Sequence, residues 1–174
     1  MSEPSSASAS STGPRCRLLL QQCTRAQLRL DDVNWVEIGR GVVVYVSFFQ
    51  GADEEIARKA AETVVKIKLS ESNNGKRIAV LDLPGSVLLI PQACLGGKRK
   101  DNSMQYHKLT AKMCGMKLFQ AMESELQKLF GSATTVTSIS DEESRPVVRS
   151  GIYGNRQVLK MESETGPYSH IIDL

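Results

Sequence analysis

The sequence lacks the residue patterns that identify most metal-binding and membrane proteins. Its four cysteines include no CxxC pair, and its two histidines, His107 and His170, lie far apart in the 174-residue chain. Zinc ligands usually occur at tighter, paired spacings, so we expect no bound metal and interpret the cysteines as reduced, packed thiols. No apolar run approaches the roughly 18–20 residues needed to span a bilayer, so we expect no membrane segment.

Two common catalytic motifs are also missing. Gly97 and Lys98 do not complete a phosphate-binding loop, because that motif needs glycine at position 92 and serine or threonine at position 99, where the chain has Gln92 and Arg99. No GxSxG nucleophile elbow is present. We therefore expect no cofactor and no serine nucleophile of the α/β-hydrolase type.

The first 14 residues differ in composition from the rest of the chain. They contain six serines and, after Met1, no large apolar side chain. Such a segment buries too little apolar surface to offset the entropy lost on ordering, so we expect a disordered tail over 1–14 and a single domain over 15–174. The tail has no apolar region typical of a secretory signal, and its first arginine is Arg15. These features predict a cytoplasmic protein.

The net charge of +3 permits nucleic-acid binding without requiring it. The basic residues cluster, however: Lys98, Arg99 and Lys100 follow two glycines directly, and Lys108 and Lys112 come soon after. Basic side chains on such a loop are suited to phosphate contacts, and a solvated loop without a partner is the alternative interpretation.

Apolar spacing predicts many short strands and two long helices. A strand is predicted over 42–49, and its residues 42–46 are apolar on both faces, which indicates a central strand. Asp53 is placed to cap a helix that begins at Glu54, and a second helix is expected over about 112–130. The remaining predicted strands are 18–30, 35–38, 78–83, 86–95, 134–139, 146–150, 157–162 and 168–172.

This order of elements predicts an α+β fold with a strongly curved, barrel-like, mainly antiparallel sheet and two long helices. Residues 73–75, Asn-Asn-Gly, predict a turn, and Pro84-Gly85 suits a type II turn. Pro91 removes a ladder donor inside the strand predicted over 86–95, which indicates an edge, a bulge or the end of the strand there.

Several short motifs, in this order along the chain, resemble the D-aminoacyl-tRNA deacylase family. They are LQQC at 20–23, EIGRGV at 37–42, NNGK at 73–76, LIPQACL at 89–95, Gly154 with Gln157-Val158, and Gly166-Pro167. The resemblance covers about 160 residues, from Cys16 onward. It implies an enzyme that hydrolyses the ester between an amino acid and tRNA.

The resemblance also implies which residues carry the reaction. Residues Gln92, Ala93 and Cys94 would form the catalytic segment, with backbone N–H groups as donors to the developing oxyanion. The neighbouring ribose 2′-hydroxyl would activate the water, so no protein base is required. A thiol nucleophile at Cys94 is the alternative mechanism, with His107 or His170 as its partner.

Departures from the family pattern point to its animal-specific branch. Gln22 and Glu164 stand where the chiral-proofreading branch has Arg and Asn, and Pro91 and Ala93 replace its Ser and Phe. We therefore expect a trans Gly166-Pro167 peptide and a pocket open to small L residues, with L-alanine on threonine tRNA as the main substrate and D-aminoacyl-tRNA as a lesser one.

The remaining expectations concern binding and assembly. The substrate-binding residues would be Gln22, Pro91, Leu95, Gly166 and Pro167. The tRNA-binding residues would be Lys98, Arg99, Lys100 and Arg156. The resemblance further implies a homodimer. Two other functions remain open at this point: a non-catalytic module that binds RNA or a protein partner, and an esterase that depends on Cys94.

Overall fold

The computed structural model describes residues 13–134, 145–164 and 168–174; the side chain of residue 134 is not described. Most of the predicted tail, most of the strand predicted over 134–139, and the Gly166-Pro167 peptide lie outside these residues. The elements, in chain order, are β1 (Cys16–Cys23), β2 (Arg25–Arg29), β3 (Trp35–Ile38), β4 (Gly41–Phe48), α1 (Glu54–Lys66), β5 (Ser70–Glu71), β6 (Arg77–Ile78), β7 (Ser86–Pro91), the 3₁₀-helix η1 (Ala93–Gly96), β8 (Lys98–Lys100), β9 (Ser103–Gln105), α2 (Lys112–Thr134), β10 (Val148–Ser150), β11 (Val158–Glu162) and β12 (Ser169–Asp173).

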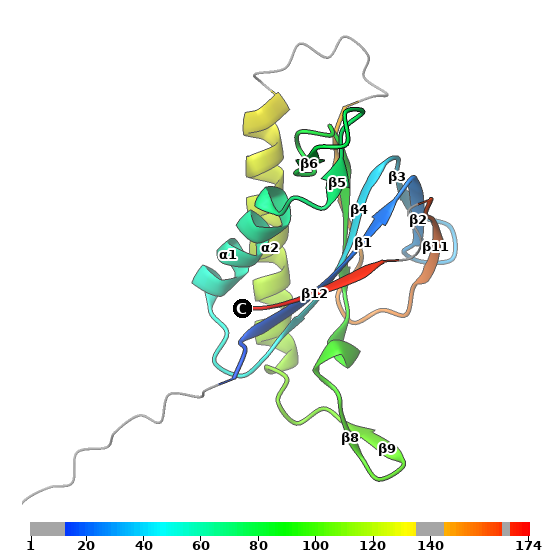
Figure 1. Ribbon diagram of the computed structural model, residues 1–174. Helices are drawn as coiled ribbons and strands as arrows, with labels where there is room; N and C mark the ends of the chain where they lie inside the picture. The colour runs from blue at the N-terminus through cyan, green and yellow to red at the C-terminus, as the bar shows by residue number, and fades with distance from the viewer. Residues whose placement is uncertain (1–12, 135–144, 165–167) are drawn as a thin grey trace, which may run out of the picture.

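A five-stranded sheet in the order β10-β7-β4-β1-β12 forms the centre of the molecule (Figure 1). Strand β4 is its middle strand, and seven of its eight residues are buried, which confirms the central position predicted from its apolar sequence. It pairs antiparallel with β1 and parallel with β7. Strand β12 is an edge strand, antiparallel to β1.

The two helices cover one face of this sheet (Figure 1). Helix α1 begins where the sequence predicted, because the Asp53 carboxylate accepts a hydrogen bond from the Ile56 N–H at 2.9 Å. The predicted apolar stripes of both helices face the sheet, where Ile56, Val64, Met122 and Leu126 are all at most 2% exposed. The main core therefore lies between the helices and the even-numbered residues of β4.

The second sheet, in the order β11-β2-β3, covers part of the opposite face. Leu28 and Ile38 from this sheet pack against Val43, Leu88 and Ile90 of the five-stranded sheet. The α+β class and the mainly antiparallel pairing are thus confirmed. In the described part of the chain the sheets are open at their edges and do not close into a barrel.

Several boundaries differ from the sequence expectations. The strand predicted over 18–30 is broken at Thr24, where the chain leaves the five-stranded sheet and enters the smaller one. Of the strand predicted over 78–83, only Ile78 is in a strand, the two-residue β6 (Arg77–Ile78). Gly85 does not have the positive φ that a type II turn requires, because the carbonyl of Val80 instead accepts its N–H in a wider turn. Thr134 ends α2 and is not the start of a strand.

None of the helices in the described part of the chain combines the length and the apolar character that crossing a membrane demands.

Candidate functional site

The segment predicted to be catalytic follows directly after the end of β7. Pro91 is the last residue of that strand and pairs with Val46 of β4, and the Gln92 N–H donates to the Val46 carbonyl at 2.9 Å. The chain then turns at Gln92 (φ −141°, ψ 78°) into η1. Pro91 therefore marks the end of the strand, one of the three outcomes its position predicted.

The N–H groups of Ala93 and Cys94 open the short helix η1. The first amides of a 3₁₀-helix have no acceptor within the helix. The Leu95 N–H already reaches the Gln92 carbonyl at 3.2 Å, but none of the described residues accepts a hydrogen bond from Ala93 or Cys94 N–H. Both residues are exposed. Two adjacent, unused donors are thus available to an oxygen atom of a ligand.

A cavity of about 370 Å³ adjoins Ala93, the first residue of η1. It is lined by Pro91, Gln92, Ala93, Lys112, Tyr153, Gly154 and Asn155. Its lining supplies an ammonium, a phenol and two side-chain amides but, in the described part of the chain, no carboxylate and no imidazole. The site can therefore hold and polarise a polar substrate, and it offers no evident protein base.

The position of Tyr153 at this cavity depends on glycine in α2. A side chain at Gly115 would overlap the Tyr153 hydroxyl, so only glycine lets the phenol lie against the first turn of the helix. The Tyr153 ring also packs on Phe119, with 5.9 Å between the ring centroids. Burial raises the pKa of Tyr153, which keeps the hydroxyl protonated and able to donate a hydrogen bond.

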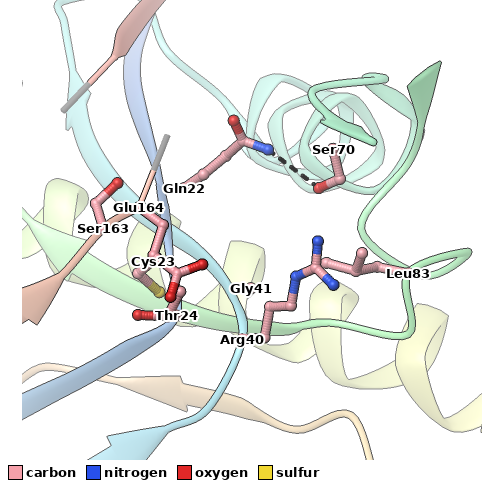
Figure 2. Close-up of a pocket in the computed structure, with 9 residues that line it drawn as sticks. All are labelled: Gln22, Cys23, Thr24, Arg40, Gly41, Ser70, Leu83, Ser163 and Glu164. Carbon is pink, nitrogen blue, oxygen red and sulfur yellow. Dashed lines mark hydrogen bonds between the residues drawn. The ribbon is translucent and has the colours of Figure 1, made fainter. Parts of the chain in front are cut away.

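A second hollow lies at the far end of β1, around Gln22 (Figure 2). The Gln22 amide is directed at Ser70, and its Nε2 donates to the Leu69 carbonyl at 2.8 Å and to the Ser70 hydroxyl at 3.3 Å. A wider depression of about 660 Å³ adjoins it, lined by Gln22, Arg40, Leu69, Glu71, Arg77, Glu164, Tyr168 and His170. Glu164 and Tyr168 flank the segment 165–167, so Gln22 lies beside the chain that leads into and out of Gly166-Pro167.

These two regions lie apart within one chain. Across the sheet, Ser169 of β12 pairs with Gln21 of β1, which pairs with Val43 of β4. Val43 in turn pairs with Leu88 of β7, and the segment predicted to be catalytic begins three residues later, after Pro91. Three steps between strands and three residues along β7 give a separation of about 17 Å. The structure therefore does not bring the described neighbours of Gly166-Pro167 next to Gln92–Cys94 of the same chain.

The residues predicted to bind tRNA are exposed and lie on the same side of the molecule as η1. Lys98, Arg99 and Lys100 form β8, one strand of a hairpin that extends beyond η1 (Figure 1). Arg156 is exposed in the loop that also carries Asn155 of the cavity lining. Leu95 lies inside η1, half-buried, and its carbonyl accepts from Arg17 Nη1 at 3.3 Å.

Sequence reasoning did not assign four of the lining residues to the catalytic site: Lys112, Tyr153, Gly154 and Asn155. Tyr153 and Asn155 lie within the motif around Gly154 and Gln157, but that motif was used only as a sign of family resemblance. The glycine at 115, inside a helical stripe, was the one local signal that a side chain from elsewhere packs there.

Histidine, cysteine and acidic side chains do not gather in groups of three or more, suited to hold a metal ion, anywhere in the described part of the chain. Neither His107 nor His170 lines the cavity beside η1, and Cys94 does not line it either.

Comparison with known proteins identifies the family. The family model described as D-Tyr-tRNA(Tyr) deacylase matches residues 19–173. The D-aminoacyl-tRNA deacylase 2 of Homo sapiens is 43% identical over 166 residues, which cover 92% of this chain and 95% of the human one. The protein of the same name from Danio rerio is 41% identical over 165 residues, covering 91% of this chain and 99% of its own.

A solved structure of a probable eukaryotic D-amino acid tRNA deacylase superimposes with a TM-score of 0.75 at 28% identity, covering 91% of this chain and 99% of the other. The sequence match, the fold and the order of the motifs therefore agree. The chain belongs to the D-Tyr-tRNA(Tyr) deacylase family, within its animal-specific branch.

Proposed function

We propose that this protein hydrolyses the ester bond of aminoacyl-tRNA, as an aminoacyl-tRNA deacylase that clears wrongly charged tRNA. The family membership supports this activity. The observation in the structure that carries it is the pair of adjacent unused N–H groups of Ala93 and Cys94, of which Ala93 lines a cavity of about 370 Å³.

In this mechanism the two amides bind the carbonyl oxygen of the ester. A water attacks the carbonyl carbon, the oxygen gains negative charge, and the amides stabilise that charge more strongly than they bind the uncharged ester. The bond to the ribose oxygen then breaks, and that oxygen takes up a proton. The ribose 2′-hydroxyl assists the water, which is consistent with a described cavity lining that contains no carboxylate and no imidazole.

The Cys94 thiol is the alternative nucleophile, because it is exposed and carries one of the two amides. A Cys94→Ala variant keeps the backbone donor and removes the sulfur. We expect it to retain most of the kcat of the wild-type protein. A loss of all hydrolysis, with alkylation by iodoacetamide inactivating the wild type, would instead identify Cys94 as the nucleophile of a cysteine-dependent esterase.

We infer that the active form is a homodimer, in which a second copy supplies Gly166-Pro167. Leu19, Tyr45 and Ile171 lie in one row across β12-β1-β4, on the face turned away from the helices, and Ile171 is 64% exposed. A two-fold axis through this row gives a self-complementary contact. In this proposal the Ser169 end of one copy lies near η1 of the other, which would bridge the separation of about 17 Å within one chain.

The assembly is tested with an Ile171→Glu variant, which places a charge at the centre of the contact. We expect a dimer for the wild-type protein and a monomer with little activity for the variant, measured by sedimentation and by ester cleavage. A monomeric wild-type protein with full activity would contradict the shared site.

We further propose a pocket open enough for a small L side chain, with L-alanine on threonine tRNA as the main substrate and D-aminoacyl-tRNA as a lesser one. Ala93 leaves more room than the family's usual Phe, and Pro91 and Leu95 would form neighbouring parts of the wall. The Gln22 amide, held by Leu69 and Ser70, would fix the wall beside a trans Gly166-Pro167.

The decisive assay uses the purified full chain with L-Ala-tRNA(Thr) and D-Tyr-tRNA(Tyr). We expect cleavage of both esters, with L-Ala-tRNA(Thr) cleaved faster than D-Tyr-tRNA(Tyr). The proposed location of the protein is the cytoplasm. Cleavage of neither above buffer, with tRNA binding retained, would identify a non-catalytic RNA-binding module.

A further inference from the structure

The β8–β9 hairpin presents two chemically different faces. Arg99 pairs directly with Met104 and Lys100 with Ser103, so alternation along each strand puts Arg99, Met104 and the adjoining Tyr106 on one face. Lys98 and Lys100 lie on the other. One face of the hairpin thus carries the Tyr106 ring, the Met104 thioether and the Arg99 guanidinium. The other face carries the ammonium groups of Lys98 and Lys100.

The first face is held against η1 by close packing at Gly97. The Met104 methyl group lies 2.7 Å, the Tyr106 ring edge 2.8 Å and the Cys94 carbonyl oxygen 3.1 Å from the point that a Cβ atom of residue 97 would occupy. Only glycine permits this approach. Tyr106 is nevertheless 42% exposed and Met104 50% exposed, so the side chains are positioned by the packing while one side of each stays open.

The second face carries positive charge without counter-ions. Within the described residues, Lys98, Lys100 and Lys108 take part in no ion pair, because the six salt bridges found there involve other side chains. Lys98 and Lys108 also line a cavity of about 190 Å³ together with Arg17, at the base of the hairpin. This arrangement of positive charge suits the phosphate groups that link successive sugars along a nucleic-acid strand.

We propose that the hairpin is a binding site for single-stranded RNA: an unpaired base stacks on Tyr106 and Met104, and the adjacent phosphates contact Lys98 and Lys108. The proposal rests on the proposed function. With the acylated nucleotide at the Ala93 and Cys94 amides, the nucleotides that precede it would lie on the neighbouring hairpin. The base must be unpaired, because only an unstacked base exposes a face to an aromatic side chain. Arg99 extends the same platform.

The test compares a long and a short substrate of the same chemistry: D-Tyr-tRNA(Tyr), and adenosine carrying D-tyrosine on its ribose. A Tyr106→Ala variant should lose about 5- to 150-fold in kcat/KM on the tRNA, the range typical of one stacking contact. It should keep the wild-type rate on the short substrate, and Tyr106→Phe should resemble the wild type on both. An equal loss on both substrates, or no loss on either, would overturn the proposal.

The phosphate contacts have an independent signature in salt dependence. For Lys98→Ala with Lys108→Ala, the slope of log KM against log salt on the tRNA should fall by about 0.7 for each phosphate that no longer meets a lysine. The matched control is Arg58→Ala with Lys59→Ala, which removes the same charge from exposed positions on α1 and should leave the slope unchanged. Equal slopes for the two double variants would contradict the site. If the wild-type protein cleaves neither substrate, the proposed function fails first.

Discussion

An Ala93→Pro variant tests the backbone donor directly, because proline at this position removes the N–H group and little else. Ala93 is exposed, and its N–H has no acceptor among the described residues. It is the first residue of η1, the helical position that tolerates proline best. The preceding residue, Gln92, has ψ 78°, outside the helical region that a following proline disfavours.

The expected effect on the transition state is several-fold larger in free energy than the expected effect on folding. Proline at a position with compatible backbone changes the free energy of unfolding by well under about 1 kcal/mol and can increase it. Loss of one oxyanion donor costs about 2.7–4 kcal/mol in the transition state, or roughly 10²- to 10³-fold in kcat. The variant should therefore fold and bind tRNA like the wild type, with a selective loss of turnover.

The assay is single-turnover cleavage of L-Ala-tRNA(Thr) or D-Tyr-tRNA(Tyr), with thermal unfolding followed in parallel. The matched control is Ala93→Val, which adds side-chain volume beside the cavity and keeps the N–H group. If the proline variant turns over within about threefold of the wild type, the Ala93 amide is not an oxyanion donor. If the valine variant loses as much as the proline variant, volume rather than the donor explains the loss.

Three further predictions concern stability and the cavity wall. Gly41→Ala should lower the free energy of unfolding in urea by about 3 kcal/mol or more, because the new Cβ would overlap the backbone of β7; an unchanged urea midpoint would mean that the two strands can separate there at no cost. Burial raises the pKa of Cys16 to about 12 and that of Cys23 to about 11, so the folded state keeps both thiols protonated while the unfolded chain ionises them near 9. The free energy of unfolding therefore falls as the pH rises from about 9 to about 12, and denaturation curves that do not change over this range would refute the assignment. Gly115→Ala should displace Tyr153 and raise KM with a smaller effect on kcat, whereas unchanged kinetics would remove Tyr153 from the substrate site.

The elements with strong local signals were predictable from the sequence. The Asp53 cap, the stripes of α1 and α2 and the apolar run of β4 all depend on residue type and spacing alone, and all are found in the structure. The turn at residues 73–75 also formed, with Gly75 at φ 72°. These features depend on contacts between neighbouring residues, which a single sequence records.

The features that the sequence did not predict share one cause, which is packing between residues distant in the sequence. The break at Thr24 is set by the transfer of the chain from one sheet to the other, and the 3₁₀-helix after Pro91 by its contacts with β4. The cavity combines residues 91–93, Lys112 and 153–155, three segments that no spacing rule relates. The position of Gln92–Cys94 was predictable only through the resemblance to a known family. The assembly that we propose would add a second chain, whose contacts a single sequence does not record.

The pairing of β1 with β12 has a consequence for how the protein folds during synthesis. Arg17 and Asp173, joined by hydrogen bonds of 2.7 and 2.8 Å, are separated by 156 positions in the sequence. Strand β1 thus leaves the ribosome long before its edge partner exists and must wait with one row of backbone groups unprotected. Contacts of such long sequence separation also slow the search for the native state. Nascent chains of this protein are for that reason expected to depend on chaperones until the last strand has been made.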